Sequence, residues 1–213
     1  MNTVRLIIFD LDGTLIQSQI EYETIRQKLK NILRDYVEED YYQQILKQQI
    51  SILELIELIK KFSNDPEAAK RALNIVEDFE FKGYENARVM PEVYELLKEL
   101  KKKGIKIAVL TNNSKKLTTY ALENYGLSEF IDAVITRDDI KNRKPDPEGI
   151  NLLVKRFGIK REECIFVGDS WLDAEASKNA GVEFVRIILN RKKQNNNDYR
   201  VIVNLKELSD IIN

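Results

Sequence analysis

Two aspartates that follow a short apolar run are the residues in this chain most suited to chemistry. Residues 7–15 read Ile-Ile-Phe-Asp-Leu-Asp-Gly-Thr-Leu, the pattern of a buried strand that ends in a glycine turn. Side chains two positions apart in a strand face the same way, so Asp10 and Asp12 are predicted to point to one side. Two carboxylates about 4 Å apart repel by roughly 4 kcal/mol at an effective dielectric constant near 20, which calls for a positive charge between them. Mg²⁺ held by carboxylates and a substrate phosphate is the usual solution.

The composition excludes several kinds of chemistry and several classes of partner. The 213-residue chain has no histidine and one cysteine, Cys164, which excludes histidine-based triads, histidine metal sites and an internal disulfide. Its 34 basic residues nearly balance its 35 acidic ones, which favours neither nucleic acid nor a membrane surface as a partner. No apolar run is long enough to span a bilayer, and the chain enters a strand at once, so we expect no signal peptide. We therefore expect a cytoplasmic protein in which Cys164 is a buried thiol on a strand.

The part of the chain that follows the two aspartates reads as helices only. Apolar residues recur at helical spacing from residue 16 to residue 84. Ser51 followed by Glu54 is a capping box, and Asp65 before Pro66 marks the start of another helix. We therefore expect an inserted, all-helical domain of about four helices over residues 16–84.

The remainder alternates apolar runs with helical patterns. The apolar runs predict strands at residues 105–110, 133–135, 164–167, 184–188 and 200–203. The helices are predicted at residues 91–103, 114–125, 146–157, 171–180 and 204–212, and the polar residues 190–198 are predicted to form a loop or hairpin tip. Such alternation predicts an α/β fold with a mostly parallel, doubly wound sheet covered by helices on both faces. We expect this core domain to comprise residues 1–15 and 85–213.

Three more groups of polar residues follow predicted strands, where parallel sheets bind their ligands. Thr111 and Asn112 offer a hydroxyl and backbone N–H groups just before a helix, which suits a phosphate. Lys144 is a cation in a loop stiffened by prolines, and Asp169 with Asp173 can turn two carboxylates toward the same site. Each group alone also fits an ordinary loop or a helix cap. Their occurrence at successive strand ends favours one shared site.

The ordered set of these residues resembles the haloacid dehalogenase superfamily of phosphohydrolases. The resemblance covers the whole strand–helix part, and it implies a doubly wound sheet with the first strand at its centre. The helical insertion is similar to the small α-helical (C1-type) cap of that superfamily, and phosphoglycolate phosphatases and pyrophosphatases are the nearest in appearance. The four motifs stand in this chain as Asp10-Leu11-Asp12-Gly13-Thr14, Thr111-Asn112, Lys144-Pro145, and Gly168-Asp169 with Asp173.

The resemblance implies a mechanism and a role for each of these residues. Asp10 is the nucleophile and Asp12 the general acid and base in a Mg²⁺-dependent hydrolysis through an aspartyl-phosphate. The ligands of the metal are Asp10, Asp12 through its backbone carbonyl, Asp169 and Asp173. The groups that hold the phosphoryl oxygens are Thr111, the Asn112 amide and Lys144. The expected substrate is a small phosphorylated metabolite, and the expected assembly is a monomer or a small homo-oligomer.

Other functions fit parts of the same pattern. A mutase of the β-phosphoglucomutase type shares every core residue, and phosphonate-cleaving relatives add a cap lysine, for which Lys28 and Lys30 are candidates. A receiver-like phospho-signalling domain needs neither the helical insertion nor the Asp169 and Asp173 pair. A silent binding protein is expected to lack a core residue, and none is missing here. Halide-removing relatives have no aspartate at the position of Asp12. We interpret Trp171 as a residue that packs beside the site.

Overall fold

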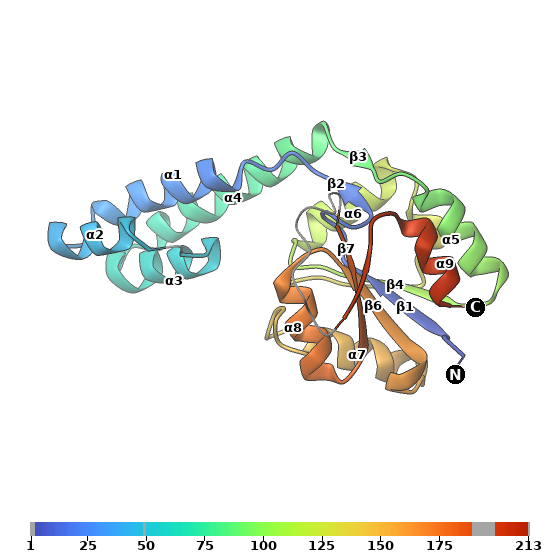
Figure 1. Cartoon of the computed structure of the whole chain (residues 1–213). Helices are drawn as coiled ribbons and strands as arrows, with labels where there is room; N and C mark the ends of the chain where they lie inside the picture. The colour runs from blue at the N-terminus through green and yellow to red at the C-terminus, as the bar shows by residue number, and fades with distance from the viewer. Residues whose placement is uncertain (1–2, 49, 189–198, 213) are drawn as a thin grey trace. The chain divides into compact units, whose positions relative to one another are not determined.

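The computed structural model describes residues 3–48, 50–188 and 199–212 (Figure 1). The predicted loop at residues 190–198 therefore lies outside the described residues. The chain divides into two compact units. The core unit comprises Met1–Gln17 and Arg88–Asn213, and the helical unit comprises Ser18–Ala87.

A parallel sheet forms the centre of the core unit. Within the described residues it has six strands in the order β5-β4-β1-β6-β7-β8, and every neighbouring pair is parallel. The strands are β1 (Leu6–Phe9), β4 (Lys106–Leu110), β5 (Ala133–Ile135), β6 (Cys164–Gly168), β7 (Glu183–Ile187) and β8 (Arg200–Ile202). Strand β1 lies between β4 and β6, so the strand order reverses there, as in other doubly wound sheets. The predicted α/β fold is confirmed.

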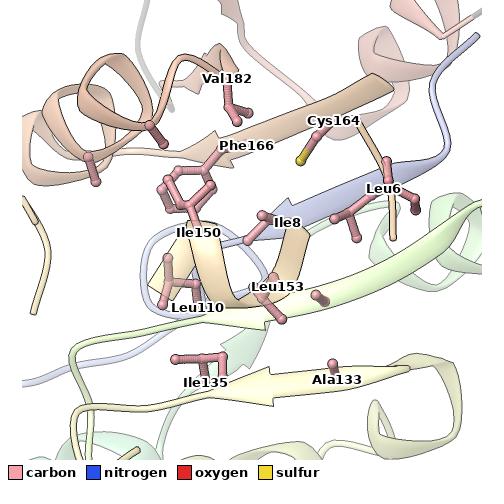
Figure 2. Packing of buried hydrophobic residues seen from close by; sticks show 14 of the residues in the cluster. Leu6, Ile8, Leu110, Ala133, Ile135, Ile150, Leu153, Cys164, Phe166 and Val182 are labelled. Carbon is pink, nitrogen blue, oxygen red and sulfur yellow. The ribbon is translucent and has the colours of Figure 1, made fainter. Parts of the chain in front are cut away.

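Helices cover both faces of this sheet (Figure 1). They are α5 (Val93–Lys102), α6 (Lys115–Asn124), α7 (Glu148–Phe157), α8 (Trp171–Ala180) and α9 (Leu208–Ile211). Figure 2 shows the cluster on one face, where Ile150 of α7 packs among the strand residues Ile8, Leu110 and Phe166. The intervening strand residues are also buried and point to the other face, where α5 packs on β4. Cys164 is buried on β6, as predicted.

Most helix ends follow the residues that predicted them, with three exceptions. Helix α7 begins at Glu148 rather than at Asp146, whose carboxylate accepts a hydrogen bond from the Glu148 amide. Ser114 and Ser170 cap α6 and α8 through their side chains. Helix α5 begins at Val93 rather than at Pro91, because Glu92 adopts a left-handed φ of 65°. Asn204 was expected to begin a continuous helix, but it caps a 3₁₀ turn that precedes α9. The Glu207 amide donates to the Asn204 carbonyl over three residues, which closes the tighter turn.

Four helices form the helical unit within the described residues. They are α1 (Tyr22–Arg34), α2 (Glu39–Leu46), α3 (Ile52–Ser63) and α4 (Pro66–Glu85). The predicted capping box is present, because the Glu54 amide donates to Ser51 Oγ and the Ser51 amide donates to the Glu54 carboxylate. Asp65 caps α4, and Pro66 occupies its first turn. No helix in the described ranges combines the length and the apolar character needed to cross a bilayer.

Two short segments of the core unit pair beside the residues that lead to and from the helical unit. Strands β2 (Ile16–Gln17) and β3 (Arg88–Val89) form an antiparallel ladder of two residues each. Such short strands have no periodicity, so the sequence did not predict them. Inside the helical unit, the Gln19 amide donates to the Gly83 carbonyl at 3.0 Å. A Cβ on Gly83 would lie 2.8 Å from Ile20 Cα, so a glycine is needed for this close approach.

Candidate active site

The first motif lies directly after the central strand. Strand β1 ends at Phe9, one residue before Asp10, although the Asp10 amide continues the ladder by donating to the Val167 carbonyl at 2.9 Å. Gly13 then turns the chain with a φ of 77°. A Cβ on Gly13 would lie 2.7 Å from Asp169 Cγ, so the glycine lets that carboxylate approach the turn. Strands β1 and β6 thereby bring Asp10 and Asp169 to the same edge of the sheet.

Lys144 is buried between two carboxylates. Its Nζ lies 2.8 Å from Asp10 Oδ1 and 2.6 Å from Asp173 Oδ1, and 5.6 Å from the centre of the Phe166 ring. The Asn112 side chain holds the main chain of Lys144, because its amide nitrogen donates to the Lys144 carbonyl and its oxygen accepts from the Lys144 amide. The sequence had suggested a phosphate contact for Asn112. The sequence did not predict that the Asn112 side chain binds the main chain of Lys144, because any residue type at position 144 offers a backbone carbonyl.

Asp173 has no exposed surface, and both of its oxygens already accept hydrogen bonds. Oδ1 accepts from Lys144, and Oδ2 accepts from the Ser170 amide and hydroxyl. A Cβ on Gly168 would lie 2.6 Å from Asp173 Cγ, so no larger residue fits there without displacing the carboxylate. These contacts fix Asp173 as the second acceptor of the Lys144 ammonium group.

Three carboxylates form a compact acidic cluster suited to a metal ion. One oxygen each of Asp10, Asp169 and Asp173 lies within 4.8 Å of the others. An all-oxygen set of this kind matches Mg²⁺ better than the softer metals, which prefer nitrogen or sulfur. Thr14 Oγ1 nearby in the sequence is buried and, among the described side chains, is the buried polar atom without a hydrogen-bond partner. Such atoms are rare and often occur where a water or an ion completes a site.

The charges of the cluster do not balance without a further cation. Burial raises the pKa of Asp10 to about 8, against the lowering effect of Lys144. Burial, followed by the charges of Asp173 and Asp12, raises the pKa of Asp169 to about 6. Burial lowers the pKa of Lys144, but Asp10 and Asp173 outweigh it and hold that pKa above its ordinary value. Burial and the neighbouring carboxylates thus raise the pKa values of Asp10 and Asp169, while two of the carboxylates raise that of Lys144. Three carboxylates face one ammonium group, and a divalent cation would supply the missing positive charge.

The remaining predicted residues lie around this cluster. Thr111 follows β4 and is buried, and its Oγ1 accepts from the Asn113 amide at 3.1 Å, so its own hydroxyl hydrogen can still be donated. Asp12 is not among the three clustered carboxylates, but its charge contributes to the raised pKa of Asp169. The structure therefore brings Asp10, Lys144, Asp169 and Asp173 together and places Thr111 one residue beyond the neighbouring strand.

The interpretation of Trp171 as a packing residue is wrong. Its side chain is 66% exposed at the first position of α8. Helix α8 packs on the sheet through Ala176 and Ala180. Trp171 lies five residues before Ala176, which places it about 140° around the helix from that contact. The aromatic residue type suggested burial, but its position on the helix turns it toward solvent.

Residues 7–187 match the family model of the haloacid dehalogenase-like hydrolases. The chain therefore belongs to the haloacid dehalogenase-like hydrolase family, and the resemblance predicted from the four motifs is confirmed. The match includes all four motifs of the core unit and the whole helical unit. The chain is therefore an enzyme of this family.

Among curated relatives, the pyrophosphatase PpaX of Bacillus velezensis is 31% identical over 98% of this chain and 95% of its own length. The phosphoglycolate phosphatase of Vibrio cholerae is 30% identical over 85% of this chain and 83% of its own. A crystal structure of a predicted phosphoglycolate phosphatase from Haemophilus somnus has the same fold, with a TM-score of 0.74, 22% identity and complete coverage of both chains. The predicted enzyme class, a phosphatase of this family, agrees with the names of these relatives.

Proposed function

We propose that the protein hydrolyses a small phosphomonoester, with the phosphoryl group held transiently on Asp10. The observation that supports this most strongly is the meeting of Asp10, Lys144, Asp169 and Asp173 at one edge of the sheet. A carboxylate nucleophile needs no histidine to activate it, which suits a chain that has none. The relatives that cleave phosphate compounds support the same reaction class.

The reaction has two displacements at phosphorus. A carboxylate oxygen of Asp10 forms a bond to phosphorus while the bond from phosphorus to the leaving oxygen breaks, and Asp12 gives that oxygen a proton. Water then attacks the phosphorus of the aspartyl-phosphate, gives its proton to Asp12 and releases inorganic phosphate and free Asp10. Lys144, 2.8 Å from Asp10 Oδ1, orients the nucleophile and offers its ammonium group to the phosphoryl oxygens.

The donor set indicates which residues would hold Mg²⁺. We assign Asp10, the Asp12 carbonyl and Asp169 to the metal, with Asp173 beside them, because both Asp173 oxygens already accept from Lys144 and Ser170. When bound, the ion supplies the positive charge that offsets the negative charge of the phosphoryl group. The hydroxyl of Thr111, the backbone N–H of Asn112 and the ammonium of Lys144 would bind the phosphoryl oxygens.

The helical unit is the part we assign to substrate selection. We propose that residues 16–84 form a cap domain and that residues 1–15 and 85–213 form the core domain, because caps that close on a substrate complete active sites and exclude water. The substrate class is a small phosphorylated metabolite, with phosphoglycolate and pyrophosphate the first to test in view of the relatives. We expect the enzyme to act in the cytoplasm as a monomer or small homo-oligomer.

Hydrolysis of p-nitrophenyl phosphate and of a panel of phosphorylated metabolites tests this function. We expect release of inorganic phosphate with Mg²⁺, and loss of that release with EDTA that excess Mg²⁺ reverses. A mutase would instead move phosphate between two hydroxyls of a sugar phosphate and release little of it to water. Turnover that EDTA leaves unchanged, or none across the whole panel, would contradict the proposal.

A further inference from the structure

We infer that Arg186 is a positioning residue, which holds the backbone turn that bears Asp169 in the orientation required for metal binding. The inference depends on the proposed function, because that function assigns Asp169 to the metal. Arg186 lies on β7, in register with Gly168 of β6, and its side chain reaches across to the residue after Gly168. Its Nε donates to the Asp169 carbonyl at 3.1 Å.

The guanidinium group of Arg186 is itself held in place. Its Nη1 donates to the Tyr199 hydroxyl at 3.0 Å. The Tyr199 ring packs edge-on against Phe184, with ring centres 5.1 Å apart, and Phe184 packs in the same way against Phe166 of β6. Phe184 and Arg186 are two residues apart on β7 and therefore share one face of the sheet. A row of aromatic rings thus connects the buried core to the contact with Asp169.

The acidic cluster explains why the turn needs an anchor. The Asp169 carboxylate lies within 4.8 Å of Asp10 and Asp173 oxygens, and like charges at that distance push Asp169 outward before a metal binds. A hydrogen bond to the Asp169 carbonyl leaves the carboxylate free for a ligand while it limits movement of the backbone. Arginine suits this task, because its planar fork can serve two acceptors in fixed directions, whereas lysine presents one point charge.

Arg186 contacts neither the phosphoryl groups nor the nucleophile in this proposal, so its loss should affect metal binding more than the chemical step. Residues that orient metal ligands typically change metal affinity about 10–100-fold when they are replaced. We expect Arg186→Met to weaken Mg²⁺ binding about tenfold or more, with turnover recovered at saturating Mg²⁺. Arg186→Lys keeps the positive charge but has no planar guanidinium group that could donate to both acceptors. We therefore expect its Mg²⁺ affinity to lie between those of Arg186→Met and the wild type.

Calorimetric titration of Mg²⁺ into the full-length protein measures this directly. The matched control is Arg200→Met, because Arg200 lies on the adjacent strand and forms an exposed ion pair with Glu183 at 3.2 Å, away from Asp169. A second readout is the fluorescence of Trp171, the single tryptophan of the chain, which lies two residues after Asp169. Thermal unfolding without Mg²⁺ shows whether each variant is folded.

The outcomes separate this inference from the proposed function. A wild-type protein that binds no Mg²⁺ would refute the function itself. Wild-type binding with equal affinity in Arg186→Met, or an equal loss in Arg200→Met, would overturn only the role of Arg186. So would full recovery in Arg186→Lys, because charge alone would then suffice. If Arg186→Met does not fold, Tyr199→Phe is the deciding variant, because it removes the hydroxyl that accepts from Arg186 Nη1. It should weaken Mg²⁺ binding by a smaller factor than the loss of Arg186, and unchanged binding would overturn the role of Arg186.

Discussion

The core unit and the helical unit bury different kinds of side chain. The core unit buries charged residues around its site, among them Asp10 after β1, Lys144 in the loop before α7, and Asp173 on α8. The helical unit buries an apolar cluster from all four helices, and among its described residues only Lys30 and Glu80 are buried and charged. Buried ion pairs contribute little net stability, because desolvation offsets most of the attraction. Their concentration in one unit therefore indicates where chemistry, rather than stability, has determined the sequence.

The exposed ion pairs of the helical unit differ in kind from the buried ion pairs of Lys144 in the core unit. Several pairs on the surface of the helical unit, such as Lys60 with Glu57, join residues one turn apart and remain exposed to water. Lys144, in contrast, pairs with Asp10, which follows β1, and with Asp173 of α8, which lie far apart in the sequence. Exposed pairs of the first kind are expected to contribute about 0–1 kcal/mol, whereas breaking a buried pair costs about 3–5 kcal/mol. Substitutions in the two units should consequently have effects of different size and kind.

The largest effect is expected for Asp10→Asn. The amide removes the nucleophile, so turnover with p-nitrophenyl phosphate should fall by at least about a thousandfold while circular dichroism stays unchanged. The control is Asp210→Asn, which changes an exposed aspartate on α9 and should leave turnover as in the wild type. Equal activity of the Asp10 variant and the wild type would exclude Asp10 as the nucleophile.

Replacement of Lys144 should cost both stability and activity. Lys144→Met leaves two buried carboxylates without their shared cation, so the free energy of unfolding of the core unit should fall by about 3–5 kcal/mol without metal. Urea unfolding followed by Trp171 fluorescence reports on the core unit, and added Mg²⁺ should recover part of the loss. Lys60→Met in the helical unit serves as the comparison, with an expected loss of at most about 1 kcal/mol. Similar losses for the two variants would remove the distinction between the units.

Two glycine substitutions, one in each unit, test whether close packing at a glycine affects metal binding. Gly168→Ala would place a Cβ 2.6 Å from Asp173 Cγ, and Gly83→Ala would place one 2.8 Å from Ile20 Cα. Both should lower the free energy of unfolding by about 1–3 kcal/mol through overpacking. Only Gly168→Ala should also weaken Mg²⁺ binding in a calorimetric titration. Unchanged Mg²⁺ affinity in that variant would show that the packing of Asp173 does not affect the metal site.

The smallest effect concerns the pH dependence of the helical unit. The backbone hydrogen bond from Ser51 holds the pKa of Glu54 below its usual range. The charged carboxylate therefore stabilises α3 above its unfolded pKa of about 4.3, and this contribution disappears as the pH falls through the lower folded value. Glu54→Gln should cost less than about 1 kcal/mol at neutral pH, since the group is exposed, and nothing at strongly acidic pH. Thermal unfolding at both pH values measures this, with Glu57→Gln as the control on the same helix; a difference that persists in acid would contradict it.

The predictable residues of the site are those in which a chemically suited side chain comes directly after a predicted strand. Asp10 and Asp169 each follow an apolar run directly, and parallel strands bring such positions to one edge. Lys144 lies nine residues after Ile135, so only its place in the order of the motifs predicted its role. Ser51 and Glu54 were equally predictable, because a capping box is a local pattern of two residues.

The parts that were not predictable depend on backbone acceptors or on very short elements. Arg186 lies in an apolar run and reads as an ordinary strand residue, since its partner is a main-chain carbonyl seventeen residues away. The side chain of Asn112 likewise binds the main chain of Lys144. The ladder of β2 and β3 has two residues in each strand, too few to show a period.

The most direct test of the shared metal site is a crystal structure of the protein soaked in Mn²⁺, whose anomalous signal marks the ion. We predict one strong anomalous peak within coordinating distance of the Asp10 and Asp169 carboxylates, with Lys144 still between Asp10 and Asp173. The peak should be absent in crystals of Asp169→Asn soaked in the same way. A peak elsewhere, or none at Mn²⁺ concentrations that support turnover, would contradict the account.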